Sequence, residues 1–463
     1  MKPSLPQGTR DFAAGTLRRR IYIIEIIKNI FELYGFEPLE TPTIENLETL
    51  MGKYGDEGDK LIFKILNNGL DNPAKKENAL LNFEQILSGK NNKDITERAL
   101  RYDLTIPFAR YMAMNSGQLT MPFKRYQIQP VWRADRPQKG RYREFLQCDA
   151  DIAGTFSLIS DAELVEIYTD VFKKLKIETD ININNRKILY SLAEITGSVE
   201  NMNALTIAID KFDKIGIEKV KDELAISGFS EKNISLIEKY TNIKGSNSEK
   251  LEQAEEIVGK SEAGKKGIEE LTFILGYLGN SLNEDSKQTI NVDFTLARGL
   301  NYYTGTIYEV KAKKVKMGSI GGGGRYDNLT GLFGVPDMPG VGISFGLDRI
   351  YDVMEELNLF PENIYQPTEI LFFNLGYEES KNAFQLMQQL RSNNISCELF
   401  YENSKLDKQF KYAAKKNIRS IIIIGSKEIA EKNCVIKNLE SGEQKTIPQN
   451  ELLKYFNKLS LQF

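Results

Sequence analysis

RADRPQKGRYREFLQCDADI, residues 133–152, joins a cation-rich loop to a segment in which apolar and polar residues alternate. Alternation with a period of two is typical of a β-strand that buries one face. Residues 121–152 are therefore predicted to form two strands around a long charged loop. This is the most informative local pattern in the chain.

The predicted second strand, residues 145–152, has two faces of opposite character. Its even positions are all apolar, which predicts a face packed on a core. Its odd positions present an aromatic ring, an amide and two carboxylates, namely Phe145, Gln147, Asp149 and Asp151. The preceding strand offers Arg125, Gln127, Gln129 and Arg133 on one parity.

The loop between these strands carries five cations within residues 133–143. Such a density fits a polyanionic ligand, because the rigid fork of arginine suits phosphate oxygens and the nearby Phe145 could stack on a purine. A solvated hairpin tip is the alternative, and charge by itself favours it.

Upstream, residues 16–34 place Leu17, Ile21, Ile24, Ile27, Ile30 and Phe31 at helical spacing. They predict a long amphipathic helix, and Gly35 is placed to end it in a left-handed conformation. Residues 36–42 contain two prolines, which allow only an edge or interrupted strand. An ordinary helix and strand without special function is the alternative.

Downstream, residues from about 190 to 287 are strongly charged and rich in helical patterns, which predicts a helical insertion. Strand-type sequence resumes at residues 290–343. A small-residue strand at 339–345 then leads into Gly346-Leu347-Asp348-Arg349, which is expected to open a helix with its apolar positions inward. By itself this is a weak signal, since glycine-rich strand-to-helix turns are common packing devices. The inward residues are predicted to be Leu347, Ile350 and Met354.

The last hundred residues alternate short aliphatic strands (370–373 and 421–424) with helices (about 378–391, 406–416 and 449–458). This alternation is typical of a compact α/β domain. Residues 361–367 are the expected linker. The expected segments of the chain are 1–189, 190–287, 288–360 and 368–463.

The composition excludes several classes of function. The net charge is −3 and the pI about 5.6, so no global basic field of the kind used by non-specific nucleic-acid binders exists. The chain contains no histidine, which excludes an imidazole base, relay or metal ligand. Three widely separated cysteines argue against a zinc site or a disulfide framework. With no signal peptide and no apolar run long enough to span a bilayer, the protein is expected in the cytoplasm.

The order of the motifs resembles a known family. A helix followed by a proline-containing strand, an arginine-rich hairpin and a glycine-rich strand with an arginine on the next helix resemble motifs 1, 2 and 3 of class II aminoacyl-tRNA synthetases. Four further segments look like signatures of histidyl-tRNA synthetases: LPQGTRDF (5–12), RPQKGRY (136–142), LARGLNYYTG (296–305) and GGRYD (323–327). The resemblance covers essentially the whole chain.

The resemblance implies a fold and a domain order. It implies an α/β (α+β) protein with the antiparallel-sheet catalytic core of class II synthetases, a helical insertion and a C-terminal α/β anticodon-binding domain. Motifs 1 and 2 would lie in residues 1–189, and the histidine signatures with motif 3 in residues 288–360. The insertion would occupy residues 190–287, and the anticodon-binding domain residues 368–463.

The resemblance also implies a histidine-binding pocket. Asp103 would accept from the α-ammonium group of the substrate with Thr105 supporting it, since a carboxylate is the natural partner of an ammonium. Tyr303 and Tyr326 would hold the imidazole, because a hydroxyl can donate to or accept from ring nitrogens. The residues expected to bind histidine are Asp103, Thr105, Gln147, Asp151, Tyr303 and Tyr326.

For catalysis the resemblance points to Arg298 and Arg133. Arg133 would bind the α-phosphate of ATP and the substrate carboxylate, and Arg298 would lie opposite, where other class II enzymes place a magnesium ion. Adenylation needs no protein base, since the attacking carboxylate is already ionised near neutral pH. No protein metal site is expected, and Mg²⁺ would be bound through ATP. The residues expected to bind ATP are Arg133, Asp135, Arg141, Phe145 and Arg349.

The implied partners are ATP, histidine, the tRNA for histidine and a second copy of the chain. Gln138 and Arg143 are the candidates for contacting the tRNA acceptor end. A basic helix at residues 405–416 could contact RNA, although a solvated lysine face is as good an interpretation. A homodimer is expected through the helix at 16–34 and the strand near Pro42. Neither DNA nor a membrane is an expected partner.

Three positions depart from the family pattern. Asp135 replaces the usual glutamate of motif 2, Asn301 replaces a common aspartate, and Leu146 fills a position often held by an aromatic or histidine residue. Asn301 removes a charge near the substrate and could weaken affinity. None of the three removes a residue to which chemistry is assigned.

Two rival functions share this catalytic core. The first is the regulatory synthetase-like subunit of ATP phosphoribosyltransferase, which lacks the C-terminal domain and tends to lose adenylation residues. Here residues 367–463 and the three arginines Arg133, Arg298 and Arg349 are present. The second is a pseudo-synthetase domain that senses uncharged tRNA, normally fused to a kinase, and no kinase motif occurs in this chain.

Overall fold

The computed structural model describes residues 2–72, 76–279, 287–297, 302–361, 364 and 368–460. The chain divides into two compact units, Met1–Phe360 and Pro361–Phe463, each of which is described by itself. The expected linker, residues 361–367, begins at this division, and the expected limits of the individual segments stay predictions.

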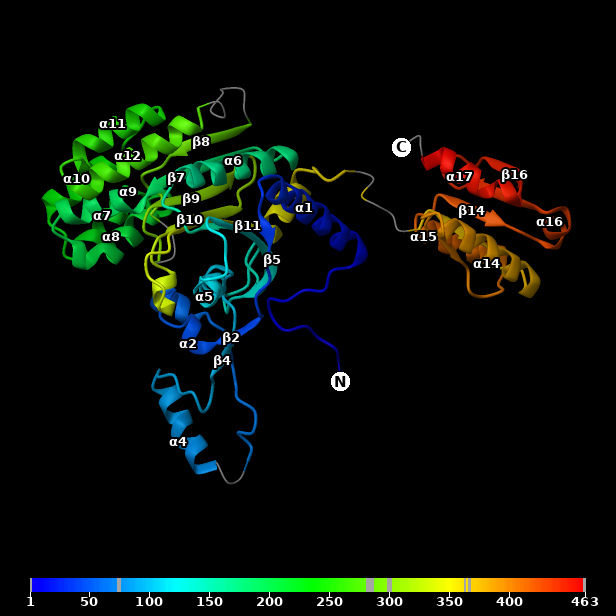
Figure 1. The fold of residues 1–463 in the computed structure, drawn as a ribbon, viewed down its shortest axis with the longest axis horizontal. Helices are drawn as coiled ribbons and strands as arrows, with labels where there is room; N and C mark the ends of the chain where they lie inside the picture. The colour runs from blue at the N-terminus through cyan, green and yellow to red at the C-terminus, as the bar shows by residue number, and fades with distance from the viewer. Residues whose placement is uncertain are drawn as a thin grey trace. The chain divides into compact units, whose positions relative to one another are not determined.

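An eight-stranded sheet forms the centre of the first unit (Figure 1). Its order is β1-β5-β6-β11-β10-β9-β7-β8, with antiparallel pairing except between β1 and β5 and between β7 and β8. The antiparallel-rich sheet confirms the predicted fold class. The strands are β1 (Glu37–Pro38), β5 (Phe123–Trp132), β6 (Glu144–Ala153), β7 (Thr179–Asn185), β8 (Gln288–Val292), β9 (Thr306–Ala312), β10 (Gly321–Tyr326) and β11 (Gly340–Gly346).

Thirteen α-helices among the described residues of this unit surround the sheet or extend from it. They are α1 (Ala14–Leu33), α2 (Leu47–Leu50), α3 (Gly55–Lys60), α4 (Lys76–Leu87), α5 (Thr105–Asn115), α6 (Ile159–Lys174), α7 (Arg186–Ile195), α8 (Met202–Asp210), α9 (Phe212–Ile226), α10 (Glu231–Thr241), α11 (Asn247–Val258), α12 (Glu262–Tyr277) and α13 (Leu347–Glu356).

The hairpin of β5 and β6 follows the alternation seen in the sequence. Ten residue pairs run from Phe123 opposite Ala153 to Trp132 opposite Glu144. Because side chains alternate between faces, Cys148, Ala150 and Ile152 lie in the core. The odd positions share the opposite face, and this prediction is confirmed.

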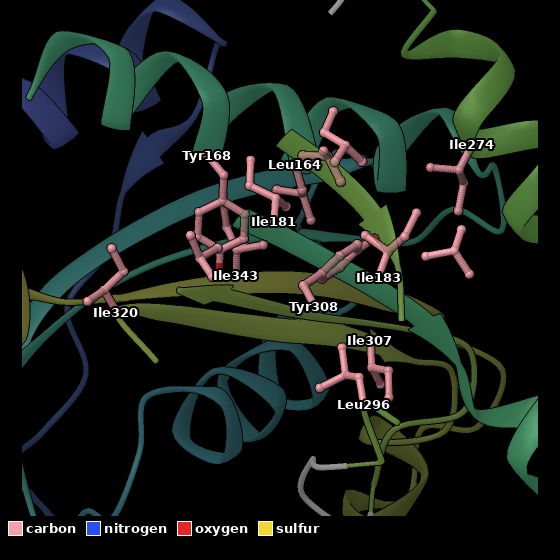
Figure 2. Close-up of a cluster of buried hydrophobic side chains, with 14 of the residues drawn as sticks. Leu164, Tyr168, Ile181, Ile183, Ile274, Leu296, Ile307, Tyr308, Ile320 and Ile343 are labelled. Carbon is pink, nitrogen blue, oxygen red and sulfur yellow. The ribbon is translucent and has the colours of Figure 1, made fainter. Parts of the chain in front are cut away.

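The main core lies on the face of the sheet that α1 and α6 cover. Leu164 and Tyr168 of α6 pack over Ile181 and Ile183 of β7 and Ile343 of β11 (Figure 2). Helix α5 lies on the other face (Figure 1). The two faces of the sheet therefore differ in character. One is apolar and buried under α1 and α6, and the other is polar.

The predicted helix near the N-terminus is confirmed as α1, although the first two residues of its apolar stripe are exposed in a single chain. Leu17 and Ile21 are 44% and 42% exposed, whereas the buried stripe runs from Arg20 through Ile23 to Phe31. At this end of the helix, polar contacts replace apolar packing, because Arg20 pairs with Asp348 at the start of α13.

The region predicted as a helical insertion contains helices in the structure, and its assignment as an insertion stays a prediction. Helices α7 to α12 connect β7 to β8, and α7 packs against α12. Their buried residues, such as Leu205 and Ile209, belong to the same hydrophobic core as the sheet. The described residues of the insertion therefore extend the hydrophobic core of the first unit.

Helix α13 follows β11 directly, as the small-residue strand and its glycine predicted. Leu347, Ile350 and Met354 are all fully buried, so the inward face of this helix is confirmed. Short 3-10 helices lie at Val199–Asn201 and Thr330–Phe333. A three-stranded sheet, β2 (Ile44–Asn46), β4 (Arg98–Leu100) and β3 (Lys64–Ile65), carries α4 away from the body of the unit (Figure 1).

The second unit is a compact α/β domain, as predicted. Its sheet has the order β13-β12-β14-β15-β16, with parallel pairing of β12 to both neighbours and antiparallel pairing of β14, β15 and β16. Its strands are β12 (Ile370–Phe372), β13 (Cys397–Leu399), β14 (Ser420–Ile423), β15 (Asn433–Asn438) and β16 (Gln444–Pro448). Its helices are α14 (Tyr377–Arg391), α15 (Leu406–Lys415), α16 (Ser426–Glu431) and α17 (Leu452–Ser460), with a 3-10 turn at Gln449–Glu451.

A search of the described residues finds no helix long and apolar enough to cross a membrane.

Candidate active site

The polar face of the large sheet is organised in rows that run across four strands. In one row Arg125 of β5 lies opposite Asp151 of β6, which lies opposite Gly342 of β11 and then Gly324 of β10. The next row contains Gln127, Asp149, Ser344 and Gly322 in the same strand order. The register thus places the alternate polar residues of β5 and β6 beside a part of β10 and β11 that carries almost no side chains.

Asp103, just before α5, is buried above this face and fully engaged by donors. Its Oδ1 accepts from the Tyr54 hydroxyl at 3.0 Å and the Ile106 backbone N–H at 3.1 Å. Its Oδ2 accepts from the Tyr302 hydroxyl at 3.2 Å. Burial raises the pKa of Asp103, and these hydrogen bonds and the charge of Arg133 act in the opposite direction. Thr105 is the first residue of α5 and also hydrogen-bonds Tyr302.

Asp151 forms the second engaged carboxylate. Its Oδ2 lies 2.7 Å from a guanidinium nitrogen of Arg125, and its Oδ1 accepts from the Tyr326 hydroxyl. Both members of the ion pair are essentially inaccessible to solvent. Burial raises the pKa of Asp151, and the Arg125 charge lowers it.

Asp149 lies between the two predicted substrate residues of β6. Burial raises its pKa to about 7, against the stabilising charge of Arg125. The Ser344 hydroxyl hydrogen-bonds Asp149, and the same hydroxyl accepts from the Gln147 amide at 2.8 Å. A short polar chain therefore links Gln147 to Asp149 through Ser344.

Four tyrosines line the region around these carboxylates. The rings of Tyr302 and Tyr303 meet edge to face with centroids 5.0 Å apart. Burial raises the pKa of each of the four, so their hydroxyls stay protonated and can donate. The four are Tyr54, Tyr302, Tyr303 and Tyr326.

Glycines keep the sheet surface open beneath these groups. A Cβ at Gly342 would lie 2.0 Å from Oδ1 of Asp151, and one at Gly324 would lie 2.8 Å from the Tyr303 ring. Any side chain at either position would displace the functional group that the resemblance assigns there. Gly324 and Gly342 are therefore explained by the close approach of these side chains and not by backbone flexibility.

Arg133 lies where β5 ends and forms a platform with two aromatic rings. Its guanidinium carbon is 4.3 Å from the centroid of Tyr102 and 5.2 Å from that of Phe145. Its Nε donates to the carbonyl of Tyr102 at 3.1 Å. An arginine fixed in this way presents its remaining N–H groups to a ligand at little cost in side-chain entropy.

The rest of the hairpin loop is more exposed. Arg141 lies 3.8 Å from Asp135, and backbone hydrogen bonds join Gln138 to Arg141 in both directions. Arg143 donates from Nε to the carbonyl of Asp135 at 3.2 Å. Gln138 and Arg141 are exposed at the tip, away from the buried carboxylates.

Arg349 reaches this loop from the first turn of α13. It donates from Nε to the carbonyl of Gly140 at 2.8 Å and from Nη1 to that of Ser319 at 2.6 Å. The sequence predicted its place at the helix start, and the structure adds that it fastens the loop. Arg349 and the loop cations are therefore brought together, whereas the carboxylates form a second group deeper on the sheet.

Several of these residues were missed by the sequence analysis. Arg125 and Asp149 were recognised as members of the polar face but were not selected as site residues. No local sequence pattern marks Tyr54 as a site residue. Tyr302 is marked only by its place next to Tyr303. Asp348 was quoted only as part of a motif, yet it accepts from Arg10, Arg20 and the backbone of Leu146 and thereby joins three segments.

Two predicted positions lie outside the described residues, namely Arg298 and Asn301. The third departure from the family pattern is accounted for, because the side chain of Leu146 packs on the core and faces away from the site. Over the described part of the chain, no group of three histidine, cysteine, aspartate or glutamate side chains is arranged to hold a metal ion.

The basic helix of the second unit is partly neutralised. Lys408 lies 2.6 Å from Glu402 and Lys416 lies 2.7 Å from Glu398. These pairs are largely exposed, and exposed pairs contribute little to stability. They reduce the positive field that the lysines alone would suggest.

Comparisons with known proteins agree with one another. The family model for histidyl-tRNA synthetase matches residues 92–350, and that for an anticodon binding domain matches residues 370–459. A histidine–tRNA ligase of Christiangramia forsetii is 50% identical over 455 residues, which is 97% of this chain and 98% of that protein. The ligase of Bacteroides fragilis is 48% identical over 99% of both chains. The crystal structure of histidyl-tRNA synthetase from Nostoc sp. PCC 7120 covers 99% of both chains with 31% identity and a TM-score of 0.79.

Proposed function

The chain belongs to the histidyl-tRNA synthetase family, and on that basis we propose that it activates histidine with ATP and transfers it to the 3′ end of the tRNA for histidine. The rival regulatory subunit is not favoured, because the curated ligases match the chain from end to end and the anticodon binding model matches residues 370–459.

Histidine binds among the buried carboxylates and tyrosines of the sheet. Asp103 accepts from the α-ammonium group, with Thr105 beside it at the start of α5. The observation that supports this assignment is that Asp103 is already held in one orientation by three donors before the substrate arrives. The other contacts are assigned to Gln147, Asp151, Tyr303 and Tyr326.

ATP binds along the hairpin loop, where the cations gather. Arg133 contacts the α-phosphate and the substrate carboxylate, and Phe145 stacks on the adenine ring. Arg141 and Arg349 bind the triphosphate tail, and Asp135 orients the loop through its contacts with Arg141 and Arg143.

Activation is an in-line displacement at the α-phosphorus. A carboxylate oxygen of histidine attacks, the bond to the β-phosphate breaks, and pyrophosphate leaves. Arg133 stabilises the negative charge of the pentacoordinate transition state, and the family resemblance assigns the same role to Arg298. No proton is transferred in this step, so a chain without histidine loses nothing.

In the second step the 3′-hydroxyl of the tRNA attacks the carbonyl of the adenylate and AMP leaves. Gln138 and Arg143 in the loop contact the acceptor end, and the second unit contacts the anticodon. A phosphate oxygen of the adenylate serves as the base, in keeping with the family.

Mg²⁺ would enter with ATP, whose phosphate oxygens would hold it. The ion neutralises phosphate charge when it is bound, and the arginines orient the phosphates.

We further propose that the enzyme is a cytoplasmic homodimer. Helix α4 carries four exposed apolar residues that a single copy leaves in water, and Leu17 and Ile21 of α1 are exposed as well. Exposed apolar surface of this kind fits a protein–protein contact. The residues of α4 are Leu80, Leu81, Phe83 and Leu87.

The test is exchange of pyrophosphate into ATP in the presence of each amino acid in turn. Exchange specific for histidine is expected, and Arg298→Ala should abolish it. Arg419→Ala, which changes an arginine of the second unit, is the matched control and should leave exchange intact. A folded enzyme without histidine-dependent exchange would move the assignment to the regulatory subunit.

A further inference from the structure

The three buried carboxylates of the polar face differ in how they are satisfied. Asp103 accepts hydrogen bonds on both oxygens. Asp151 accepts one from Tyr326 on Oδ1, and its Oδ2, although it has no hydrogen-bond partner among the described residues, lies 2.7 Å from the guanidinium of Arg125 in an ion pair. Asp149 receives one from Ser344, but its Oδ1 has no hydrogen-bond partner in the part of the chain that the structure describes. The side chain is only 2% exposed, and a buried carboxylate oxygen without a donor is costly. Asp149 therefore needs a donor that a ligand can supply.

The surroundings of Asp149 leave room for such a ligand. It lies midway between Gln147 and Asp151 on the same face of β6, and its row continues through Ser344 to Gly322. A Cβ built at Gly322 would meet no atom closer than 3.5 Å. The sheet surface beside Asp149 thus carries only the small residues Ser344 and Gly322, and Asp149 lies between Gln147 and Asp151, which are assigned to histidine binding.

The position along the strand indicates which end of histidine meets Asp149. Arg133, assigned to the substrate carboxylate, lies at the loop end of β5. Two residues of a strand advance by about 7 Å. Asp149 therefore lies about that distance farther from the loop end of the strand than Gln147 does. Asp103 is already assigned to the α-ammonium group. The imidazole is the remaining part of the substrate that carries an N–H donor.

We propose that Asp149 accepts a hydrogen bond from a ring N–H of the substrate imidazole and so selects histidine by the proton on its ring. This inference rests on the proposed function, and it adds a specificity-determining residue to the histidine pocket. Gln147 acts with it, because the Ser344 hydroxyl accepts from Gln147 and donates to Asp149.

Electrostatics make the contact sensitive to protonation. The pKa of Asp149, about 7, lies close to the ordinary value of an imidazole, about 6.5, so the two groups can share one proton. An ionised Asp149 favours the imidazolium form of the ring and raises the pKa of the bound imidazole. The titratable groups that interact with Asp149 are Arg101, Asp103 and Arg125, Cys148 and Asp151 of β6, Tyr168 of α6 and Tyr303.

The absence of histidine from the chain provides a direct measurement. Histidine labelled with ¹⁵N in its ring, bound without ATP to enzyme purified without a polyhistidine tag, gives imidazole signals that come from the substrate alone. Their chemical shifts report the protonation of the bound ring as pH is varied. Calorimetry on the same samples gives the dissociation constant for histidine.

The wild-type complex should show an imidazole pKa raised by about one unit or more above that of free histidine. In Asp149→Asn the bound ring should titrate at least one unit lower than in wild type, with binding of histidine weakened roughly tenfold to a hundredfold. Asp170→Asn is the matched control, because Asp170 of α6 accepts a hydrogen bond from Tyr34, the residue after α1, outside the polar face. Binding of ATP should be equal in all three proteins.

Each contrary outcome has a distinct meaning. A bound imidazole that titrates alike in wild type and Asp149→Asn would overturn the role of Asp149 while leaving the proposed function intact. If Asp149→Asn does not fold, a wild-type imidazole pKa at or below that of free histidine would overturn it as well. Failure of wild type to bind histidine at all would instead contradict the proposed function.

Discussion

Two regions of the same active site differ in the sign and the exposure of their charged side chains. The carboxylates Asp103, Asp149 and Asp151 are each 2% exposed and lie on strands or at a helix start. The cations at the tip of the hairpin loop are open to water, with the side chains of Arg141 and Lys139 53% and 72% exposed. Burial makes the carboxylate region selective, since a wrong ligand leaves charges unpaired. Because the loop is exposed, its cations attract a highly charged ligand through an interaction that salt screens. Amino-acid choice and nucleotide capture are thereby separated.

The largest effect is expected at the buried ion pair of Asp151 and Arg125. Asp151→Asn would leave an inaccessible guanidinium without its partner, which costs about 3–5 kcal/mol of the free energy of unfolding. Denaturant unfolding of the catalytic unit measures this loss. A loss below about 1 kcal/mol would show that the carboxylate region is not held by this pair.

Asp149 should make stability depend on pH. The pKa of Asp149 rises from 3.8, the ordinary value for an aspartate, to about 7 in the folded protein, so folding favours the protonated form. Stability from this group is fully present below pH 4 and is lost as pH rises to 7, by roughly 4 kcal/mol. Asp149→Asn should remove that slope. Parallel pH–stability curves for the two proteins would contradict the burial argument.

Asp103→Asn should damage histidine binding without affecting ATP. The change removes the negative charge that faces the α-ammonium group but keeps the size of the side chain. We expect the KM for histidine to rise on the order of a hundredfold, the loss of one charge-assisted hydrogen bond. Steady-state exchange kinetics with each substrate varied in turn provide the measurement. An equal rise in both KM values would indicate a general loss of structure.

Arg349→Ala should give the reverse pattern with a smaller magnitude. It removes the hydrogen bond that fastens the loop at Gly140, a second hydrogen bond to the carbonyl of Ser319 before β10, and one cation near the phosphates. The KM for ATP should rise about tenfold, while that for histidine stays within twofold. Arg19→Ala is the control. It removes an exposed ion pair with Glu355, which lies on α13 like Arg349, and it should change neither KM value.

The smallest effect concerns salt. Raising ionic strength from about 0.05 to 0.5 M shortens the Debye length and should raise the KM for ATP a few-fold more than the KM for histidine. Arg141→Ala should flatten this dependence, because its side chain is exposed. Equal salt dependence for both substrates would remove the distinction between the two regions.

The polar face was predictable because it is encoded locally. Alternation in residues 145–152 was enough to assign Gln147 and Asp151 to one side and Ile152 to the other. Such a period of two survives folding, since the pleat of a strand enforces it. The family resemblance then supplied roles that periodicity does not provide.

The partners of these residues were not predictable in the same way. Tyr54 reaches Asp103 across 49 residues of chain, and Arg10 reaches Asp348 across 338. Contacts of this kind depend on how the elements assemble and leave no periodic signal. The exposed Leu17 shows the same limit, because helical spacing does not say which turn meets a neighbouring element.

The separation of the two regions is tested most directly by one set of exchange measurements. Histidine-dependent exchange of pyrophosphate into ATP should be measured over a grid of histidine and ATP concentrations for wild type, Asp103→Asn and Arg349→Ala. The account predicts that Asp103→Asn raises only the KM for histidine and that Arg349→Ala raises only the KM for ATP. Changes in both KM values in both variants would contradict it.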